Sequence, residues 1–175
     1  VDTFAKSLDD YPSTYNFHES RDYVDYTDDI YVGYRYFETI PGAAEKVVYP
    51  FGYGLSYTTF DVETVSAGVV NSNCTSEANK LYAKVRVTNT GKFSGKEVVQ
   101  VYIAKPQGKL GKPAKELAAF EKTRELQPGE SQLMILTWEI NDMASYDDLG
   151  KVKKSAYVLE AGSYDIYVGT SVRDV

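Results

Sequence analysis

Alternation of apolar and polar positions dominates the chain from Phe60 onward and predicts a succession of β-strands. In "LYAKVRVTNTG" the apolar residues Leu81, Ala83, Val85 and Val87 fall on every second position. Such a period of two is typical of a strand that buries one face. The stretch "SQLMILTWEI" shows the same period, with its larger apolar side chains at Met134, Leu136, Trp138 and Ile140. By contrast, "KEVVQVYIAKP" is apolar on both faces at its centre, which predicts a central strand.

Turn signals separate these runs and bring the expected number of strands to about seven. Pro128-Gly129 favours a tight turn, 107–113 is a glycine- and lysine-rich loop expected to be flexible, and 141–151 is expected to be a connection with one helical turn. Two last strands flank Ala161-Gly162-Ser163. Seven short strands at this spacing predict an all-β, two-sheet sandwich. In it Tyr164 would form a tyrosine corner, its hydroxyl bonding back to upstream backbone, or would simply fill the core.

The first 59 residues differ in character and predict an irregular arm. Residues 1–30 are polar and acidic without a sustained period, and the aromatic-rich Tyr31–Thr39 predicts one strand. A compact domain seldom holds so long a stretch of irregular structure unless it wraps another body. We therefore divide the chain into an arm, 1–59, and a sandwich domain, 60–175.

The segment "YPFGYGLSYTTF", residues 49–60, holds five aromatic residues and two glycines but no charge. Exposed, these side chains would form a larger apolar patch than monomers usually tolerate. We expect the arm to pack on another domain, and its packing candidates are Tyr34, Tyr36, Phe51, Tyr53, Leu55 and Tyr57. Gly52 and Gly54 would let the backbone turn and lie close to its neighbour.

Composition narrows the class of protein further. The net charge of −6 gives no electrostatic footprint for nucleic-acid binding. No apolar run reaches the length of a membrane span, and the single Cys74 excludes an internal disulfide or a metal–thiolate cluster. We thus expect neither nucleic-acid nor membrane partners. Because the chain opens with Val1 rather than methionine, we also expect a piece of a larger protein.

The residues offer no active site of their own. His18, the only histidine, lies beside Glu19 and Asp22 in a segment with no predicted framework, so a solvated side chain is expected. The carboxylate pairs Asp9-Asp10, Asp28-Asp29 and Asp147-Asp148 are adjacent in sequence, whereas the two acids of a glycosidase must face each other across a sugar; solvated turns are expected instead. Asn73-Cys74-Thr75 fits a glycosylation sequon by chance. No catalytic residue, cofactor site or metal site is predicted.

Longer segments resemble one family. "DDIYVGYRYFET" and "VVYPFGYGLSYTTF" are similar to the end of the α/β sandwich domain of glycoside hydrolase family 3, the β-glucosidase and β-xylosidase family. "VRVTNTGKFSGKEVVQVYI", "KELAAFEK", "LQPGES" and "YDIYVGTSVRD" resemble the fibronectin type III-like domain that follows it. The opening "VDTFAKSLDDYPSTYNF" is similar to bacterial members.

The resemblance implies an accessory piece of a β-glycosidase. The family's nucleophile stands on a (β/α)8 barrel that needs about 200 residues or more, so no catalytic residue is carried over and the isolated chain is not expected to be an enzyme. The expected partners are the barrel and the α/β sandwich of the same parent, or a second copy through the arm. A bacterial cytoplasmic or secreted location would follow the parent. The alternatives are a carbohydrate-binding module that presents Tyr53, Tyr57, Tyr102 and Tyr167, and an independent adhesive sandwich.

Overall fold

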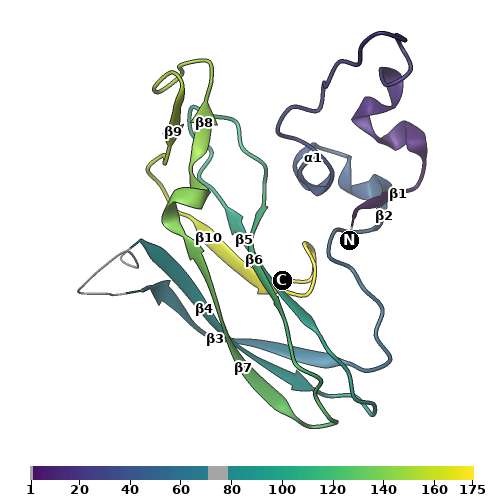
Figure 1. Ribbon diagram of the computed structural model, residues 1–175, viewed down its shortest axis with the longest axis vertical. Coiled ribbons are helices and arrows are strands. Elements are labelled where there is room, and N and C mark those ends of the chain that lie inside the picture. The colour runs from purple at the N-terminus through teal and green to yellow at the C-terminus, as the bar shows by residue number, and fades with distance from the viewer. Residues whose placement is uncertain (1, 71–78) are drawn as a thin grey trace.

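Two three-stranded antiparallel sheets face each other in this computed structural model, which describes residues 2–70 and 79–175 (Figure 1). One sheet has the order β3-β4-β7, formed by β3 (Phe60–Val69), β4 (Lys80–Asn89) and β7 (Ser131–Glu139). The other has the order β10-β5-β6, formed by β10 (Asp165–Gly169), β5 (Val98–Ala104) and β6 (Glu116–Lys122). The predicted all-β sandwich is confirmed, with β5 at the centre of its sheet. Cys74 and the sequon lie outside the described residues.

The core forms where the apolar faces of the two sheets meet. β4 and β7 contribute the side chains that the alternation had assigned to a buried face, and β5 adds three more: Ala83, Val85, Val87, Met134, Leu136, Trp138, Val99, Val101 and Ile103. Burying each Val, Leu, Ile or Met side chain of this set stabilises the fold by roughly 1.5–3 kcal/mol before the entropy of ordering is subtracted. The period-two pattern therefore reports the core directly.

Two turn predictions are confirmed in detail. At Pro128-Gly129 the amide of Glu130 donates to the carbonyl of Gln127 over 2.9 Å, and Gly129 takes a φ of +78°, as a type II turn requires. At the tyrosine corner the hydroxyl of Tyr164 donates to the carbonyl of Glu160 over 2.9 Å, and its ring also packs on the core.

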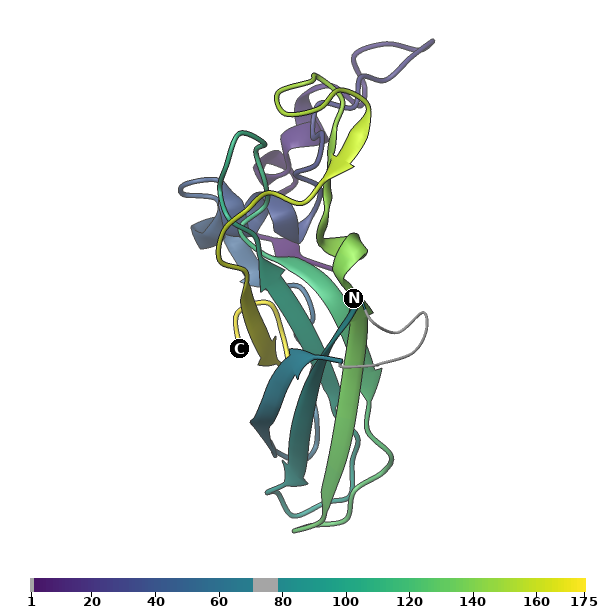
Figure 2. The same ribbon diagram turned by 90° about the vertical axis from the view of Figure 1, so that its left-hand side faces the viewer.

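The connection after β7 holds more structure than the sequence indicates. The expected helical turn is η4 (Ile140–Met143), but it leads into β8 (Ser145–Asp147), which pairs with β9 (Ala156–Val158) as a separate hairpin. A three-residue strand shows too few positions for an alternation to be seen. The hairpin and the arm both lie at the upper end of the sandwich (Figures 1 and 2).

The arm is irregular, and the strand expected at Tyr31–Thr39 is wrong. Instead, α1 (Tyr34–Thr39) is a helix that starts after Gly33, whose φ is +58°, and ends just before Pro41. Aromatic residues favour strands, but here Phe37 is buried on the helix, where its ring meets those of Tyr11 and Tyr36 edge-on. The rest of the arm comprises β1 (Phe4–Ala5), η1 (Leu8–Asp10), η2 (Pro12–Tyr15), η3 (Ala44–Lys46) and β2 (Val47–Tyr49). Pairing of β1 with β2 brings the two ends of this region together.

Candidate inter-domain interface

Helix α1 docks on the edge strand β6 and on the loop before it. The amide of Leu117 donates to the Tyr34 hydroxyl over 2.9 Å, and the amide of Ala114 donates to Thr39 Oγ1 over 2.8 Å. Arg35 adds an ion pair with Glu116, 3.4 Å between nitrogen and oxygen. An edge strand presents unpaired amides to its surroundings, and here the arm supplies acceptors for them.

An aromatic cluster joins the helix, the linker and the central strand. The rings of Tyr34 and Phe51 lie 4.6 Å apart at 30°, and Tyr34 meets Tyr102 edge-on at 6.2 Å. Tyr102 is fully buried and donates to Gln100 Oε1 over 2.5 Å. Burial, together with the nearby Tyr34 and Glu38, raises the pKa of the Tyr102 hydroxyl above its ordinary value, so it stays a neutral donor.

Residues after β10 fasten the other side of the arm. Arg173 donates through Nε to Glu38 Oε1 over 2.9 Å and through a terminal nitrogen to the Ala44 carbonyl over 3.0 Å. The amide of Val172 donates to the Phe51 carbonyl over 3.0 Å. The arm is thus held on two sides, by β6 and by 172–173.

The linker between β2 and β3, residues 50–59, is pinned to the sandwich at both ends. Near its start, Gln100 Nε2 donates to the Gly52 carbonyl over 3.3 Å, and a Cβ added at Gly52 would collide with the Gln100 side chain. Near its end, the buried Thr58 hydroxyl donates over 2.7 Å to Oδ1 of Asn89, which is also buried. Gly52, with a φ of +84°, supplies both the close approach and the backbone turn expected of it.

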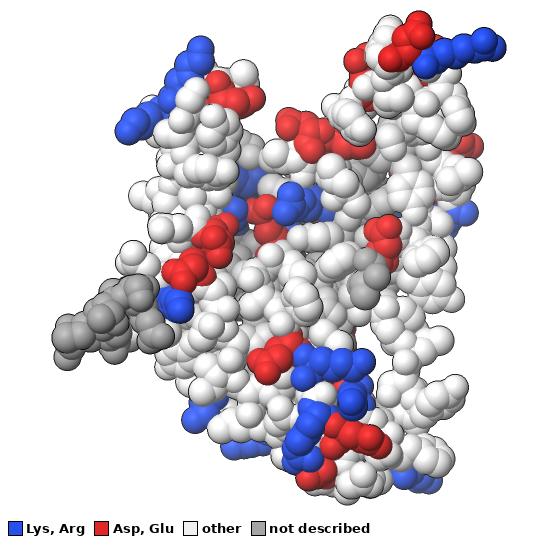
Figure 3. All heavy atoms as spheres, in the orientation of Figure 1, with Lys and Arg blue, Asp and Glu red and all other residues white. Residues whose placement is uncertain are grey.

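Between these two anchors the linker points apolar side chains outward. Tyr53 is 47% exposed and stacks on Tyr49, while Leu55 and Tyr57 are 91% and 96% exposed. In Figure 3 the right-hand side of the molecule, where the linker runs, shows mostly uncharged atoms. The six packing candidates therefore divide. Tyr34, Tyr36 and Phe51 are half-buried within the chain, whereas Tyr53, Leu55 and Tyr57 are left on its surface.

Two of the tyrosines considered for sugar binding are not available as open platforms. Tyr102 is enclosed, as described above. Tyr167 is half-buried, and the Lys115 ammonium sits 4.8 Å from the centre of its ring. Only Tyr53 and Tyr57 of that set are exposed.

Sequence reasoning missed two carboxylates that shape the loops, the buried Asp147 and the partly exposed Glu160. Asp147, expected in a solvated turn, is 1% exposed and accepts four backbone amides, those of residues 150–153, over 2.7–3.0 Å. Burial acts to raise the pKa of Asp147, but the four donors outweigh it and hold the pKa below its ordinary value. Glu160 pairs with the buried Lys112 and pins the loop expected to be flexible. The only signal for Asp147 in the sequence is the pair Asp147-Asp148 shortly before Gly150, which indicates a turn but not a buried carboxylate.

The remaining polar candidates do not assemble into a catalytic or metal site. His18, Glu19 and Asp22 are exposed, and the His18 ring contacts the ring of its neighbour Phe17 at an interplanar angle of 39°. Within residues 2–70 and 79–175, no group of three or more metal-ligating side chains is placed to hold an ion. In the same part of the chain no helix is long and apolar enough to cross a membrane.

The sandwich, with its tyrosine corner and its docked arm, defines a fibronectin type III-like domain, and the family model described as "Fibronectin type III-like domain" matches residues 97–172. The chain is 62% identical to a segment of β-glucosidase A from Butyrivibrio fibrisolvens. The alignment covers 99% of this chain and 22% of that protein. A β-glucosidase structure from Paenibacillus barengoltzii superposes with a TM-score of 0.90 at 52% identity, covering 99% of this chain and 18% of that one. For the β-glucosidase of Kluyveromyces marxianus the TM-score is 0.85 at 38% identity, covering 99% and 19%.

Over nearly its whole length the chain therefore matches one segment of glycoside hydrolase family 3 β-glucosidases, and this segment includes the fibronectin type III-like domain. It spans about a fifth of the length of the relatives it matches. Because these sources include a yeast as well as bacteria, the matches do not restrict the host to bacteria.

Proposed function

We propose that this chain is a non-catalytic accessory part of a family 3 β-glycosidase, which stabilises and positions the catalytic domains of a parent that hydrolyses β-linked glucosides or xylosides. In this proposal the arm, 1–59, is the contribution to the α/β sandwich, and 60–175 is the buttress on which it rests. The (β/α)8 barrel and the rest of the α/β sandwich are the partners.

The observation that carries the proposal is the linker with its two anchors. Thr58 and Gly52 are fixed on the sandwich, and yet Leu55 and Tyr57 between them are almost fully exposed. Because the backbone that carries these apolar side chains is already fixed, a partner that covers them loses little binding free energy to ordering this segment. Covering each one contributes roughly 1.5–3 kcal/mol, which is enough for two residues to decide how firmly two domains are joined.

The test is a double substitution, Leu55→Ser with Tyr57→Ser, in the full-length protein that carries this chain. We expect a lower melting temperature and faster loss of aryl β-glucoside hydrolysis on warming, with KM unchanged at low temperature. Tyr157→Ser, at a tyrosine that is 76% exposed on the separate β8–β9 hairpin, is the matched control. A full-length protein that withstands the double substitution as well as the control would overturn the proposal.

Self-association is the corresponding expectation for the chain alone, since its usual partner is missing. Sedimentation of the isolated chain should show a concentration-dependent dimer that the Leu55→Ser, Tyr57→Ser variant does not form. If the unsubstituted chain stays monomeric at high concentration, self-association is wrong. The buttress role is then decided by the substitutions in the full-length protein alone.

The carbohydrate-binding alternative rests on Tyr53 and Tyr57, the two tyrosines of its original four that are exposed. Titration of the chain with β-1,4-linked gluco-oligosaccharides separates the two functions. Saturable binding that is lost in Tyr57→Ser would favour the binding module, and its absence would favour the buttress.

A further inference from the structure

One long side of the sandwich is open. Among the described residues, β3 and β10 are each the last strand of their sheet, and neither has a partner on its outer edge. On the opposite side β6 and β7 contact each other, and the amide of Arg124, just after β6, donates to Gln132 Oε1 on β7 over 2.9 Å. The two sheets are thus closed together along β6 and β7 but not along β3 and β10.

Strand β3 exposes side chains that its pairing places on the core face. Residues paired in an antiparallel ladder project to the same face. Thr64 pairs with Val85 and Ala67 with Ala83, and both partners are fully buried, yet Thr64 and Ala67 are exposed. Val69, further along β3, is 50% exposed. On β7, the other neighbour of β4, the corresponding residues are at most 4% exposed: Met134, Leu136 and Trp138. The second sheet therefore covers β4 and β7 but does not reach β3.

Strand β10 shows the same lack of cover. Ile166 and Val168 pair with Ile103 and Val101 of β5, which are at most 2% exposed, but they stay only partly buried where they pack against the core. An edge strand also presents backbone amides and carbonyls along its free edge. The open side therefore combines uncovered apolar side chains on two strands with hydrogen-bonding groups along one of them.

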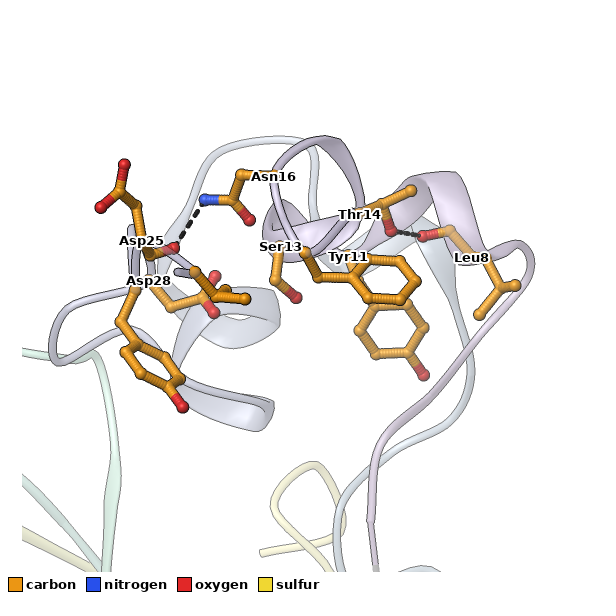
Figure 4. A pocket seen from close by; sticks show the side chains of 10 residues that line it. Leu8, Tyr11, Ser13, Thr14, Asn16, Asp25 and Asp28 are labelled. Carbon is orange, nitrogen blue, oxygen red and sulfur yellow. Dashed lines mark hydrogen bonds between the residues drawn. The ribbon is translucent and has the colours of Figure 1, made fainter. Parts of the chain in front are cut away.

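The arm does not close this side, because its contacts lie elsewhere. Helix α1 docks on β6, and the linker reaches only the start of β3. The outer lobe of the arm, residues 8–28, bonds to itself: Figure 4 shows the Asn16 amide donating to the Asp25 carbonyl, over 2.8 Å. None of the described residues therefore supplies a cover.

The residues after β10 turn back beside it. The amide of Thr170 donates to the Asp174 carbonyl over 2.9 Å, and a Cβ added at Gly169 would collide with that carbonyl and with Val175 Cα. Figures 1 and 2 both show the C-terminal end of the chain beside the end of β10. Such a reversal leads the backbone antiparallel to β10.

We infer that a strand of the parent polypeptide, outside residues 1–175, pairs antiparallel with the free edge of β10 and closes the core over β3. It would be an extended segment about as long as β10, which has 5 residues, with apolar side chains toward β3 on alternate positions and polar ones between them. The matched relatives are long enough to supply it, since the chain covers 22% of one and 18% of another. The inference rests on the proposed function, since it names one way in which the parent is joined to this chain.

Cysteine labelling of the whole chain and of the full-length protein that carries it tests the cover over β3. Thr64→Cys places a thiol on the open side, in a background where the chain's only cysteine is removed by Cys74→Ser. A maleimide, located by mass spectrometry, should label residue 64 about tenfold more slowly in the full-length protein, because labelling there requires local opening. Glu63→Cys, on the opposite and exposed face of β3, is the matched control and should react alike in both. Equal rates at residue 64 in the two proteins would overturn the inference.

Hydrogen exchange at β10 separates a paired strand from a cover made of side chains alone. In an edge strand about half of the amides point away from the neighbouring strand, so residues 165–169 should show a fast-exchanging fraction in the isolated chain. That fraction should exchange about tenfold more slowly, or less, in the full-length protein. A fast fraction that persists in the full-length protein would mean that no strand pairs with β10, which overturns the inference.

A second copy of the chain is the competing occupant of the same edge. Protection of 165–169 that appears on concentrating the isolated chain, but is absent from the full-length protein, would assign the edge to a second copy and overturn the inference. Failure here is distinguishable from failure of the proposed function. A full-length protein that is destabilised by the linker substitutions, but whose residue 64 is labelled as fast as in the isolated chain, keeps the buttress role and loses only this strand.

Discussion

The ammonium of Lys112 and the carboxylate of Glu160 form an ion pair that is almost completely buried beside the tyrosine corner. Glu160 also accepts the amides of Lys109 and Leu110, over 2.7 and 3.3 Å, and Lys112 donates to the Pro106 carbonyl over 2.9 Å. One carboxylate therefore organises the whole loop before β6, the loop on which α1 docks.

Acid should loosen this loop, with a sign that follows from the pKa of Glu160. The hydrogen bond from Lys112 and the two loop amides lower that pKa in the folded chain, so the unfolded chain binds the proton more readily. The stabilisation from Glu160 is complete at pH values above its pKa in the unfolded chain, about 4.3. It is lost as the pH falls through the lower pKa that Glu160 has in the folded chain. Glu160→Gln should lower the melting temperature at neutral pH by several degrees and flatten its decline in acid. The exposed Glu121→Gln should do neither, and a Glu160→Gln profile parallel to the natural one would contradict this.

Asp147 should control the rigidity of the β8–β9 hairpin. Asp147→Asn leaves one oxygen to accept amides that now share two, so the amides of residues 150–153 should exchange with solvent about tenfold faster or more. Asp148→Asn, at the exposed neighbour, is the control. Unchanged protection at 150–153 would mean that the loop is held by other contacts.

Docking of the arm should depend on the Tyr34–Phe51 contact. Because Phe51 is half-buried, Phe51→Ala should lower the free energy of unfolding by about 2 kcal/mol, less than the cost at a fully buried ring. Tyr34→Phe keeps the stack but leaves the Leu117 amide without its acceptor, at a cost of about 1 kcal/mol. Urea unfolding measures both, and limited proteolysis should show earlier cleavage within 1–59. Phe120→Ala, at an exposed ring, should change neither readout.

Leu55 and Tyr57 should contribute almost nothing to the isolated monomer. Their side chains are exposed, so Leu55→Ser with Tyr57→Ser should alter its unfolding free energy by no more than about 0.5 kcal/mol. This null result complements the destabilisation expected in the full-length protein. A large loss in the monomer would show that both residues serve the chain's own fold.

The sequence predicted those parts of the fold whose signal is local. β4 and β7 were recognised because alternation runs for nine or ten residues, and the turn at Pro128-Gly129 because two residues determine it. Helix α1 was mistaken for a strand because six aromatic-rich residues hold less than two helical turns, and the positive φ of Gly33 that starts it leaves no trace in a pattern of hydrophobicity.

The candidate interface could be predicted only in part, because most of its contacts leave no local signal in the sequence. An uncharged aromatic stretch indicated that 49–60 lies against something, but not which side chains face the chain's own domain. That division depends on pairs far apart in sequence, such as Thr39 with Ala114 and Thr58 with Asn89. Asp147 escaped notice because its role comes from the backbone of the following loop.

The hydrogen bond from Arg173 to Glu38 joins residues 135 positions apart, so it can form only late in the synthesis of this chain. The arm leaves the ribosome first, but neither Arg173 nor the Val172 amide that meets Phe51 yet exists. Until β10 and the residues after it have been made, the arm can contact β5 and β6 but lacks the hydrogen bonds from Val172 and Arg173. The contact of the arm with residues 172–173 therefore forms only after the whole sandwich, from β3 to β10, has been made.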